Sequence, residues 1–406
     1  MKIQGEHNML DYLKNALVNM PSGWLKTTTH RLDIYDENLA KTQFTEQFNA
    51  LFEDNNSSPA ALQELPTAYD YIRLGHPLSC ILEWAVAHLN SINPEEVISF
   101  ASKTAPILAI LRKNLLDHKD TQIIYTDALP EGFDADTIRS VYGYTFSLKK
   151  INDTDAIPSF NGSTIFISST DEIGAFDLPS EIDFYISLHA SLGSILVVKG
   201  SQNKGYISEI QHVRRRETVA MTPVNSLAAL KSLIAQSPKD IDKNNRSDDK
   251  ASTLASIKEI TNSYAKPLVA SSGLSMQYAI MMGLIDHAQG NHAGKPIKFI
   301  VPTNCYGGTN DQARRVAACL DNVEVVDLAV DGDHDMVSSI ETVLAKIATE
   351  DAVPYIIAEI PTNPRVEVPN LQKLREVLST VRNTAIGDTA IDPVFILDQT
   401  FCPNIH

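Results

Sequence analysis

The chain has 406 residues, of which 43% are hydrophobic and 21% are charged, a composition typical of a globular protein large enough for two or three domains. Its formal net charge of −16 argues against nucleic acid or an anionic membrane surface as the main partner, because both repel an acidic protein. We expect the arginine run 214–216 to be solvated surface rather than a nucleic-acid patch.

The four cysteines, at positions 80, 305, 319 and 402, form no CxxC pair, so we expect no zinc or other metal site. Sparse cysteines in a long chain fit a reducing compartment. Acidic residues interrupt the apolar pattern of residues 1–20, which predicts an amphipathic helix rather than a signal peptide. No apolar run reaches the roughly 18 residues of a membrane span. The sequence therefore predicts a cytoplasmic protein.

The first 60 residues are predicted to form a polar helical segment, after which short apolar stretches alternate with helical ones. A clear helix start lies at Thr222, the expected N-cap, followed by Pro223 in the first turn. The expected strands of this part are 96–101, 121–126, 163–168, 183–188 and 194–200. The expected helices are 80–90, 104–115 and 222–235.

A polar, charged stretch, 237–253, is predicted to be a linker or mobile loop. Strands and helices then alternate again. The expected strands are 266–271, 297–302, 323–328, 355–360 and 394–398, and the expected helices are about 274–288, 310–320, 335–348 and 370–383. Continuous apolar strands between amphipathic helices predict an α/β fold with a mainly parallel sheet covered on both faces.

Polar residues stand where several of these later strands end, the edge at which open parallel sheets bind ligands. In "SSGLS", Ser272 and Gly273 open a helix whose free amides suit a phosphate or carboxylate, although every strand–helix junction needs a cap. In "YGGT", Tyr306 is either a half-buried turn aromatic or a ring that stacks on a flat ligand. Thr309 or Asn310 is expected to cap the helix that follows.

Two further stretches follow the same pattern. In "EIPTNP", Glu359 lies at a strand end, and Asn363 either binds a ligand through its amide or only bonds its own turn. In "LDQTFCP", an apolar strand leads to Asp398. A carboxylate there needs a partner, which is either a structural amide or arginine or the protonated nitrogen of a heterocyclic ligand.

The order and spacing of these four stretches resemble the large domain of fold-type I pyridoxal-phosphate enzymes, in particular the Cys/Met-metabolism, cystathionine γ-synthase-like family. The likeness covers about residues 266–406. It implies a sheet of the pyridoxal-phosphate-transferase type, like that of the aspartate aminotransferase large domain. It also implies pyridoxal 5′-phosphate as the cofactor.

The resemblance further implies which residues hold that cofactor. The serine–glycine turn and the amide after it hold the phosphate, Tyr306 stacks on the pyridine ring, and Asn363 lies beside ring and substrate. Asp398 pairs with the ring nitrogen, which keeps the ring able to accept electrons from a substrate carbanion. Within this segment the implied contacts are Ser272, Gly273, Leu274, Tyr306, Asn363, Asp398 and Thr400, of which Tyr306 and Asp398 are the implied catalytic residues.

One essential residue of that family has no counterpart here. The family carries its cofactor as a Schiff base on a lysine downstream of the aspartate, in an S-x-T-K motif. No lysine follows Lys373 in this chain. The chain is therefore expected to be either a fragment that stops before the Schiff-base lysine or an inactive remnant, and its last strand is expected to lack its usual neighbours.

The first α/β segment resembles a degenerate copy of the same domain. "YIRLGHPLSCILE" matches a family stretch in which Tyr71 and Arg73 correspond to a pair that reaches the cofactor phosphate of a neighbouring subunit, and His76 replaces an asparagine. In "ISFASKTAP", Lys103 replaces the glycine of the phosphate turn, and would crowd or contact the phosphate. In "DFYISLHASLGS", Ala190 replaces the lysine and can form no imine. The alternative is an unrelated α/β domain with chance matches.

The resemblance implies a pyridoxal-phosphate-dependent conversion of a sulfur-containing amino acid, by γ-replacement or by β/γ-elimination, in a homo-oligomer with shared sites. The competing hypotheses are a catalytically inactive pseudoenzyme with a structural or regulatory role, and a module that binds a small molecule without chemistry. The predicted division is a helical segment at 1–60, a degenerate copy at 61–236, a linker at 237–263 and an incomplete cofactor-binding domain at 264–406.

Overall fold

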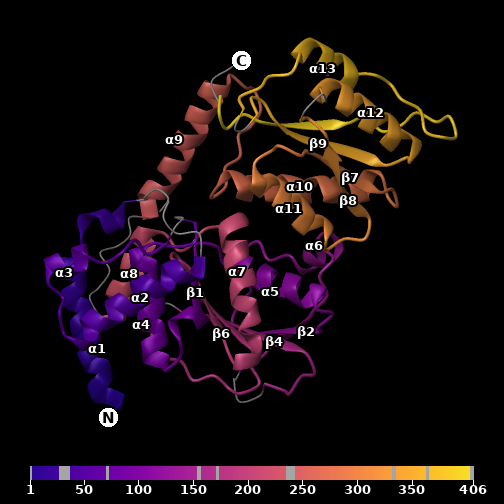
Figure 1. Cartoon of the computed structure of the whole chain (residues 1–406). Coiled ribbons are helices and arrows are strands. Elements are labelled where there is room, and N and C mark those ends of the chain that lie inside the picture. The colour runs from indigo at the N-terminus through magenta and orange to yellow at the C-terminus, as the bar shows by residue number, and fades with distance from the viewer. Residues whose placement is uncertain are drawn as a thin grey trace. The chain divides into compact units, whose positions relative to one another are not determined.

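The computed structural model describes residues 2–26, 37–69, 73–152, 157–170, 173–234, 243–331, 335–362 and 365–402. The chain divides into two compact units, Met1–Asp134 with Tyr144–Asp242, and Ala135–Gly143 with Lys243–His406. Each unit has its own sheet with helices packed against it (Figure 1). The predicted α/β class, with mostly parallel strands flanked by helices, is therefore confirmed in both units.

The first unit is built on a six-stranded sheet in the order β1-β6-β5-β4-β2-β3. β2 is parallel to both β3 and β4, and β4 is parallel to β5, whereas β6 is antiparallel to β5 and β1. The carboxyl ends of all strands except β6 therefore lie at one edge. The strands are β1 (Val97–Phe100), β2 (Thr121–Tyr125), β3 (Ser147–Lys150), β4 (Ser163–Ser169), β5 (Phe184–His189) and β6 (Gly193–Val198).

Helices cover both faces of this sheet. One face packs in a single apolar core with α1, α2, α4 and α8, so the N-terminal helices share a core with the α/β part. On the other face, Tyr206 of α7 packs on Phe184 of β5 with ring centroids 4.8 Å apart, and α5 lies beside α7. The helices are α1 (Lys2–Asn19), α2 (Glu37–Glu53), α3 (Pro59–Gln63), α4 (Pro77–Asn90), α5 (Ala105–Leu116), α7 (Gly205–Arg216) and α8 (Pro223–Leu233).

A fully buried cluster of charges ties four elements of the first unit together. The Glu83 carboxylate of α4 accepts hydrogen bonds from Arg214 of α7 and from the amide and hydroxyl of Ser99 in β1, each at 2.8 Å. Its other oxygen pairs with Lys41 of α2 at 2.7 Å. Arg214 also donates to Tyr69 Oη at 2.9 Å. The prediction that the arginine run is solvated is thus wrong for Arg214, because Glu83 draws that side chain into the core.

The two cations also set the ionisation of the carboxylate between them. Burial alone would raise the pKa of Glu83, but the Lys41 ammonium and the Arg214 guanidinium lower it to about 2. Glu83 is therefore charged at neutral pH, and each member of the buried group has a partner of opposite charge.

His76 begins helix α4 and is held in one protonation state. Its Nδ1 accepts a hydrogen bond from the Ser79 amide at 3.2 Å, and its Nε2 lies 2.7 Å from the Met221 carbonyl oxygen. A nitrogen that accepts carries no proton, and one that bonds a carbonyl must donate, so the ring is neutral with its proton on Nε2. Burial lowers the pKa of His76 to about 4.

The stability of the first unit is expected to fall as the pH drops from 6.5 towards 4. The neutral ring is the bonded form, so its contribution is complete above the ordinary pKa of 6.5 and is lost as the pH approaches the folded value of about 4. With about 1.4 kcal/mol per pKa unit, the loss reaches about 3 kcal/mol. Urea unfolding across this range measures it, and a His76→Asn variant that kept the same pH dependence would refute the assignment.

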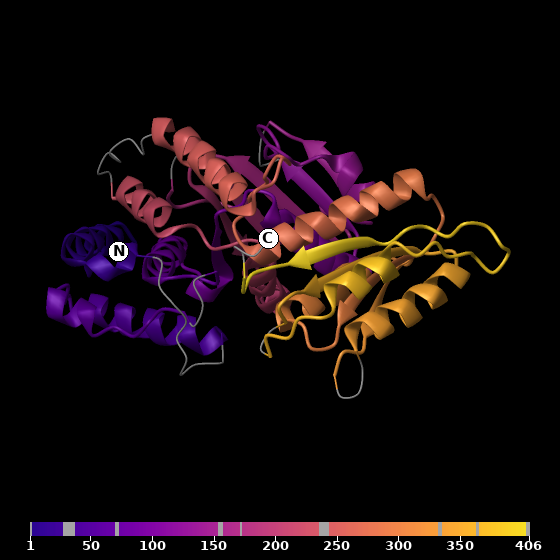
Figure 2. The same ribbon diagram turned by 90° about the horizontal axis from the view of Figure 1, so that it is seen from above.

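The second unit contains a four-stranded, fully parallel sheet in the order β10-β9-β7-β8. Helices α10 and α11 share an apolar core with one face, and α12 and α13 with the other (Figure 2). The strands are β7 (Ile297–Pro302), β8 (Val323–Leu328), β9 (Val353–Glu359) and β10 (Val394–Asp398). The helices are α6 (Ala135–Ser140), α9 (Lys243–Thr261), α10 (Gly273–Asn291), α11 (Gly307–Ala317), α12 (Met336–Thr349) and α13 (Leu371–Leu378).

Three local predictions differ from the structure. The stretch 266–271 is not a strand, and its Leu268 is 73% exposed, because the sheet offers it no neighbour. β3 is not predicted by the apolar pattern, because it is an edge strand with the polar sequence SLKK. The stretch 237–253 is helical from Lys243 onward, which is possible because no glycine or proline interrupts residues 239–265. In contrast, Thr222 is confirmed as the N-cap of α8.

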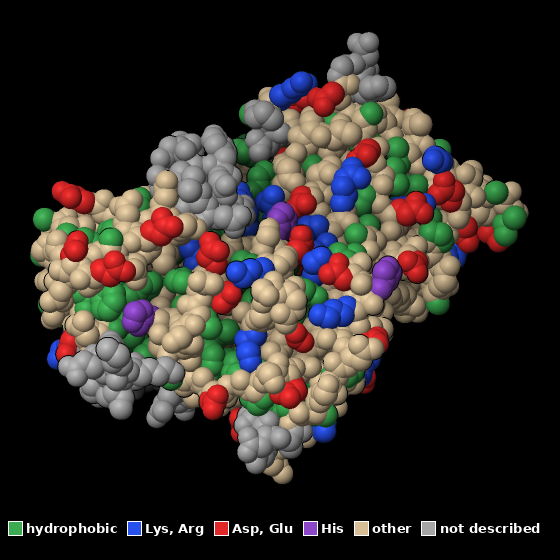
Figure 3. Space-filling model, turned by 60° about the horizontal axis from the view of Figure 1, so that its bottom comes forward, with side chains coloured by type: hydrophobic (Ala, Val, Ile, Leu, Met, Phe, Trp, Pro, Cys, Tyr) green, Lys and Arg blue, Asp and Glu red, His purple; other side chains and the backbone are tan. Residues whose placement is uncertain are grey.

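The distribution of surface charge and the character of the helices relate to the expected lack of a nucleic-acid or membrane partner. On the face shown in Figure 3, acidic and basic side chains are interspersed over the described surface. None of the helices in the described part of the chain has the length and apolar character that crossing a membrane requires.

Candidate functional site

The starts of α10 and α11 meet at Gly308, at the carboxyl edge of the second sheet. A Cβ atom built on Gly308 would lie 2.4 Å from the Tyr306 ring and 2.8 Å from Leu274 Cδ1. Real side chains do not tolerate such contacts, so glycine at this position lets the tyrosine ring and the first turn of α10 approach each other. The SSGLS and YGGT stretches, distant in sequence, are thus brought together.

Helix α10 presents a serine-capped N-terminus at this point. Ser272 is the N-cap, and its Oγ accepts a hydrogen bond from the Ser275 amide at 3.1 Å. The amides of Gly273 and Leu274 come first in the helix and have no acceptor within it. A Cβ built on Gly273 meets no atom within 4 Å, so the space beside these amides is open. The helix dipole and the amides together favour an anion there.

Tyr306 stands just before α11, and the residue is 39% exposed. Its amide donates to Glu359 Oε1 at 2.7 Å, so the carboxylate at the end of β9 fixes the start of α11. The helix begins at Gly307, which makes the predicted cap at Thr309 or Asn310 wrong. The sequence marks Glu359 as a strand-end acid, but its bond to Tyr306 depends on the order of the strands in the sheet.

Asp398 ends β10 directly beside Glu359 in the parallel register. Its Oδ1 accepts hydrogen bonds from the amide and the hydroxyl of Thr400, at 2.9 and 2.6 Å. Side chains of paired residues point to the same face, so both carboxylates face one side of the sheet. Asp398 therefore has a local structural partner, one of the two kinds expected for a strand-end acid, and it is partly exposed to solvent.

The strand that carries Asp398 is less buried than its sequence predicts. Among the strands of the described chain, β10 lies at the edge of its sheet and pairs with β9 alone. Val394 and Leu397 are 41% and 44% exposed. Among the described residues, the apolar sequence of β10 therefore has a strand neighbour on one side.

Three further predicted cofactor contacts, Asn363, Tyr71 and Arg73, stay predictions. Asn363 and Tyr71 lie outside the described residues. Arg73 is 7% exposed within the first unit, where its carbonyl accepts a hydrogen bond from the Ala220 amide at 2.8 Å. That Arg73 reaches a cofactor phosphate remains a prediction.

Two first-unit stretches compared with family motifs in the sequence analysis also meet at one sheet edge. Lys103, at the start of α5, donates its ammonium to the Ala190 carbonyl oxygen at 2.7 Å. A pocket of about 250 Å³ opens there between residues that follow β1, β2, β4 and β5. Within β5, Ser187 Oγ lies 3.2 Å from His189 Nε2. The Lys103 ammonium and the Ala190 backbone are therefore in direct contact at this edge.

Two other kinds of chemistry to consider are a metal centre and a nucleophilic thiol. Over the described residues, no group of three or more His, Cys, Asp or Glu side chains is placed to hold a metal ion. The Cys305 thiol lies close to the candidate site, but burial and the Glu359 carboxylate raise its pKa to about 11, so it is protonated at neutral pH and is a poor nucleophile.

Comparison with known proteins finds likeness only among solved structures. No protein-family model matches the sequence, and none of the curated proteins does. The metB protein from Corynebacterium glutamicum is 14% identical, with a TM-score of 0.29 over 48% of this chain and 60% of that one. Cystathionine γ-lyase from yeast is 13% identical, with a TM-score of 0.34 over 61% of this chain and 68% of its own.

A third similar structure is a putative O-acetylhomoserine (thiol)-lyase from Campylobacter jejuni, solved with pyridoxyl-lysine phosphate. It is 14% identical, with a TM-score of 0.29 over 62% of this chain and 75% of that one. The chain spans 60% of the length of the metB protein. The activity, substrates and partners of a whole enzyme are therefore proposals for this chain.

Proposed function

We propose that the second unit binds pyridoxal 5′-phosphate and belongs to an enzyme that converts sulfur-containing amino acids. The observation that carries the proposal is the meeting of the capped α10 start with the Tyr306 ring at Gly308. Pyridoxal 5′-phosphate has three parts to bind. Its phosphate is bound by amide donors, its pyridine ring stacks on a flat aromatic side chain, and its protonated ring nitrogen pairs with a carboxylate. The α10 start, Tyr306 and Asp398 offer one of each at the same sheet edge.

Each residue has a defined task in this proposal. When bound, the cofactor supplies an electron-poor ring that stabilises negative charge on a substrate carbon. The Gly273 and Leu274 amides bind its phosphate, and Tyr306 covers one face of the ring. Asp398 holds a proton on the ring nitrogen, and Thr400 orients the carboxylate through two hydrogen bonds. Glu359 keeps Tyr306 in place by binding its amide.

Activity is tested with the chain loaded with pyridoxal phosphate. Because no lysine follows Lys373, methylamine is added as the free amine that such a lysine would supply. The substrate is L-cystathionine, and the matched control is its analogue with carbon in place of sulfur. We expect 2-oxo acid and ammonia from the thioether only, and at least a tenfold loss in Asp398→Ala. Bound cofactor with no product at any methylamine concentration would overturn the enzymatic proposal.

The second candidate is a pseudoenzyme with a structural or regulatory role. It is favoured by Ala190, which can form no imine and whose carbonyl accepts a hydrogen bond from Lys103. We further propose that the first unit is a degenerate copy of the second, since the stretches matched to the phosphate turn and to the lysine strand lie against each other at one sheet edge. Cofactor bound without turnover in the methylamine assay would favour this candidate.

A further inference from the structure

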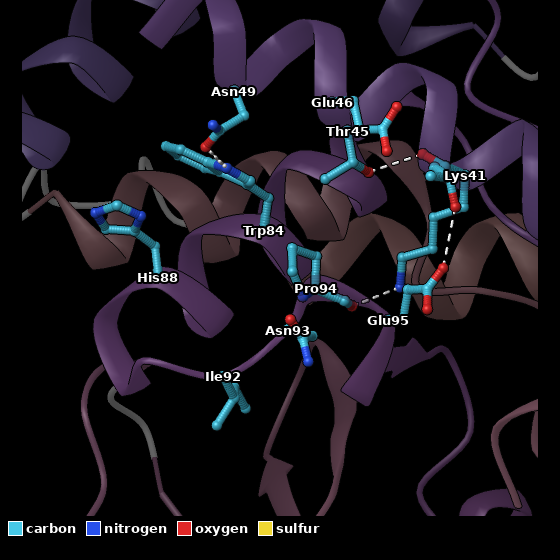
Figure 4. Close-up of a pocket in the computed structure, with 11 residues that line it drawn as sticks. Lys41, Thr45, Glu46, Asn49, Trp84, His88, Ile92, Asn93, Pro94 and Glu95 are labelled. Atoms are coloured by element: carbon cyan, nitrogen blue, oxygen red, sulfur yellow. Dashed lines mark hydrogen bonds between the residues drawn. The ribbon is translucent and has the colours of Figure 1, made fainter. Parts of the chain in front are cut away.

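The groove between α2 and α4 has a volume of about 640 Å³ but offers a ligand no accessible aromatic wall (Figure 4). Trp84, on its α4 side, is 2% exposed, and its indole N–H donates to Asn49 Oδ1 at 3.0 Å. The rings of Phe48, Phe52 and His88 pack against the indole. A smaller cavity in the same unit is better suited to a ligand, because polar side chains line it directly.

This smaller cavity, of about 290 Å³, lies against the face of the first sheet that shares a core with α4, and its volume is near the lower limit of small-molecule sites. β5 lines it with three buried polar side chains, Tyr185, Ser187 and His189, each at most 8% exposed. They are alternate residues of one strand and therefore point to the same face of the sheet. The neighbouring strand β6 adds an apolar wall with Ile195 and Val197.

The segment 173–176 also lines the cavity and is held in place by α4. The Asn90 side chain accepts a hydrogen bond from the Phe176 amide at 2.8 Å and donates one to the Gly174 carbonyl oxygen at 3.4 Å. Ala175, between these two residues, is exposed and lines the cavity. The cavity therefore opens to solvent at a segment whose position is fixed by hydrogen bonds.

Two hydroxyl groups of the polar wall keep hydrogen-bonding capacity for a ligand. Within the described part of the chain, Ser187 Oγ makes one hydrogen bond, to His189 Nε2 at 3.2 Å. Tyr185 Oη likewise makes one, to Ser168 Oγ at 2.9 Å. Because a hydroxyl can both donate and accept, each of these oxygens can form a further hydrogen bond to a group inside the cavity.

The lining of the cavity also restricts the charge of a ligand. No described residue that lines it is an aspartate, glutamate, lysine or arginine. A charged molecule would therefore lose its hydration there without gaining a counter-charge. An uncharged molecule with a polar and an apolar side keeps its hydrogen bonds at β5 and removes its apolar side from water against β6.

We propose that this cavity binds a small uncharged molecule that carries a hydroxyl group on an apolar body, with Ser187 as the hydrogen-bonding partner of that hydroxyl. The volume of about 290 Å³ is that of about ten water molecules, at roughly 30 Å³ each in the liquid, so the ligand has about ten non-hydrogen atoms or fewer. None of the lining residues belongs to the candidate cofactor site, and the proposal does not depend on the proposed function.

Phenol and toluene are the first pair of probes, since they differ only by a hydroxyl in place of a methyl group. Calorimetry is expected to show saturable binding of one phenol per chain, with toluene about three- to tenfold weaker, the effect of one hydrogen bond. Benzoate and benzylammonium, which add a negative or a positive charge to the same ring, should bind at least tenfold more weakly than phenol.

Two serine variants locate the binding site. Ser187→Ala should bring the affinities for phenol and toluene within about twofold of each other, because the hydroxyl of the ligand loses its partner. Ser163→Ala is the matched control, since Ser163 is a fully buried serine of β4 in the same sheet but does not line the cavity. It should leave the preference for phenol unchanged, and circular dichroism checks that both variants are folded.

Four results would overturn the proposal. Equal affinities for phenol and toluene in the unchanged chain would show that the polar wall takes no part in binding. A charged ring that bound as tightly as phenol would exclude selection for an uncharged ligand. The same preference in Ser187→Ala as in Ser163→Ala would place the phenol hydroxyl away from β5. The lack of saturable binding of any probe would show that the cavity holds only water.

Discussion

A Glu83→Gln variant is expected to lose about 3–5 kcal/mol of the free energy of unfolding of the first unit. Glutamine is close to glutamate in size, so the change removes the charge and leaves the packing. Lys41 and Arg214, each 2% exposed or less, then lack their counter-charge. Two buried cations side by side cost far more than the one lost hydrogen bond. Urea unfolding followed by tryptophan fluorescence measures the loss, since both tryptophans, Trp24 and Trp84, belong to the first unit.

The matched control is an exposed ion pair in the same unit. Asp117 bonds Lys113 at 2.8 Å one helical turn away, and both side chains are open to solvent. Asp117→Asn should change the free energy of unfolding by no more than about 0.5 kcal/mol. A Glu83→Gln variant that behaved like this control would show that water or a rearranged partner already screens the buried cluster.

A Gly273→Glu variant is expected to weaken binding of pyridoxal phosphate at least tenfold, about 1.4 kcal/mol. The position is the first residue of α10 and has no atom near its missing side chain, so a larger residue fits without strain. An acid in the first turn also suits the helix dipole, so folding should not suffer. The new carboxylate would stand where the cofactor phosphate is proposed to bind and would repel it.

Gly273→Gln is the matched control, since it has the same size without the charge. It should keep most of the affinity, and binding of pyridoxal, which lacks the phosphate, should differ little between the two variants. Titration followed by the cofactor's visible absorbance gives all four affinities. If the glutamate variant bound pyridoxal phosphate as the unchanged chain does, the phosphate would have to lie elsewhere.

The fold was predictable where apolar runs marked the strands. The strands from β1 to β10 were found with the exception of β3, whose polar edge sequence carries no such signal. The stretch 266–271 was wrongly predicted as a strand, because an apolar run forms a strand only if the edge of a sheet is available to pair with it. That Ala135–Gly143 belongs to the second unit could not be predicted from the sequence pattern, because it depends on the packing of residues such as Val141 in the core of that unit.

The candidate site was predictable as a set of residues but not as an arrangement. Ser272, Tyr306 and Asp398 were marked by their place at strand ends. The closeness of Leu274 and Tyr306 at Gly308, and the bond from Tyr306 to Glu359, depend on strand order, which a periodic pattern does not encode. Burial of Arg214 was not predictable for the same reason, since it arises where α7 meets α4, which are far apart in the sequence.

Hydrogen–deuterium exchange with and without pyridoxal phosphate tests the central claim most directly. The account predicts slower exchange at the start of α10, around Gly273 and Leu274, and at the start of α11 after Tyr306, because bound phosphate and ring would shield those amides. Little change is expected at the start of α5 beside Lys103. Protection confined to the α5 region, or no protection in the second unit at cofactor concentrations that saturate the absorbance change, would contradict the proposed site.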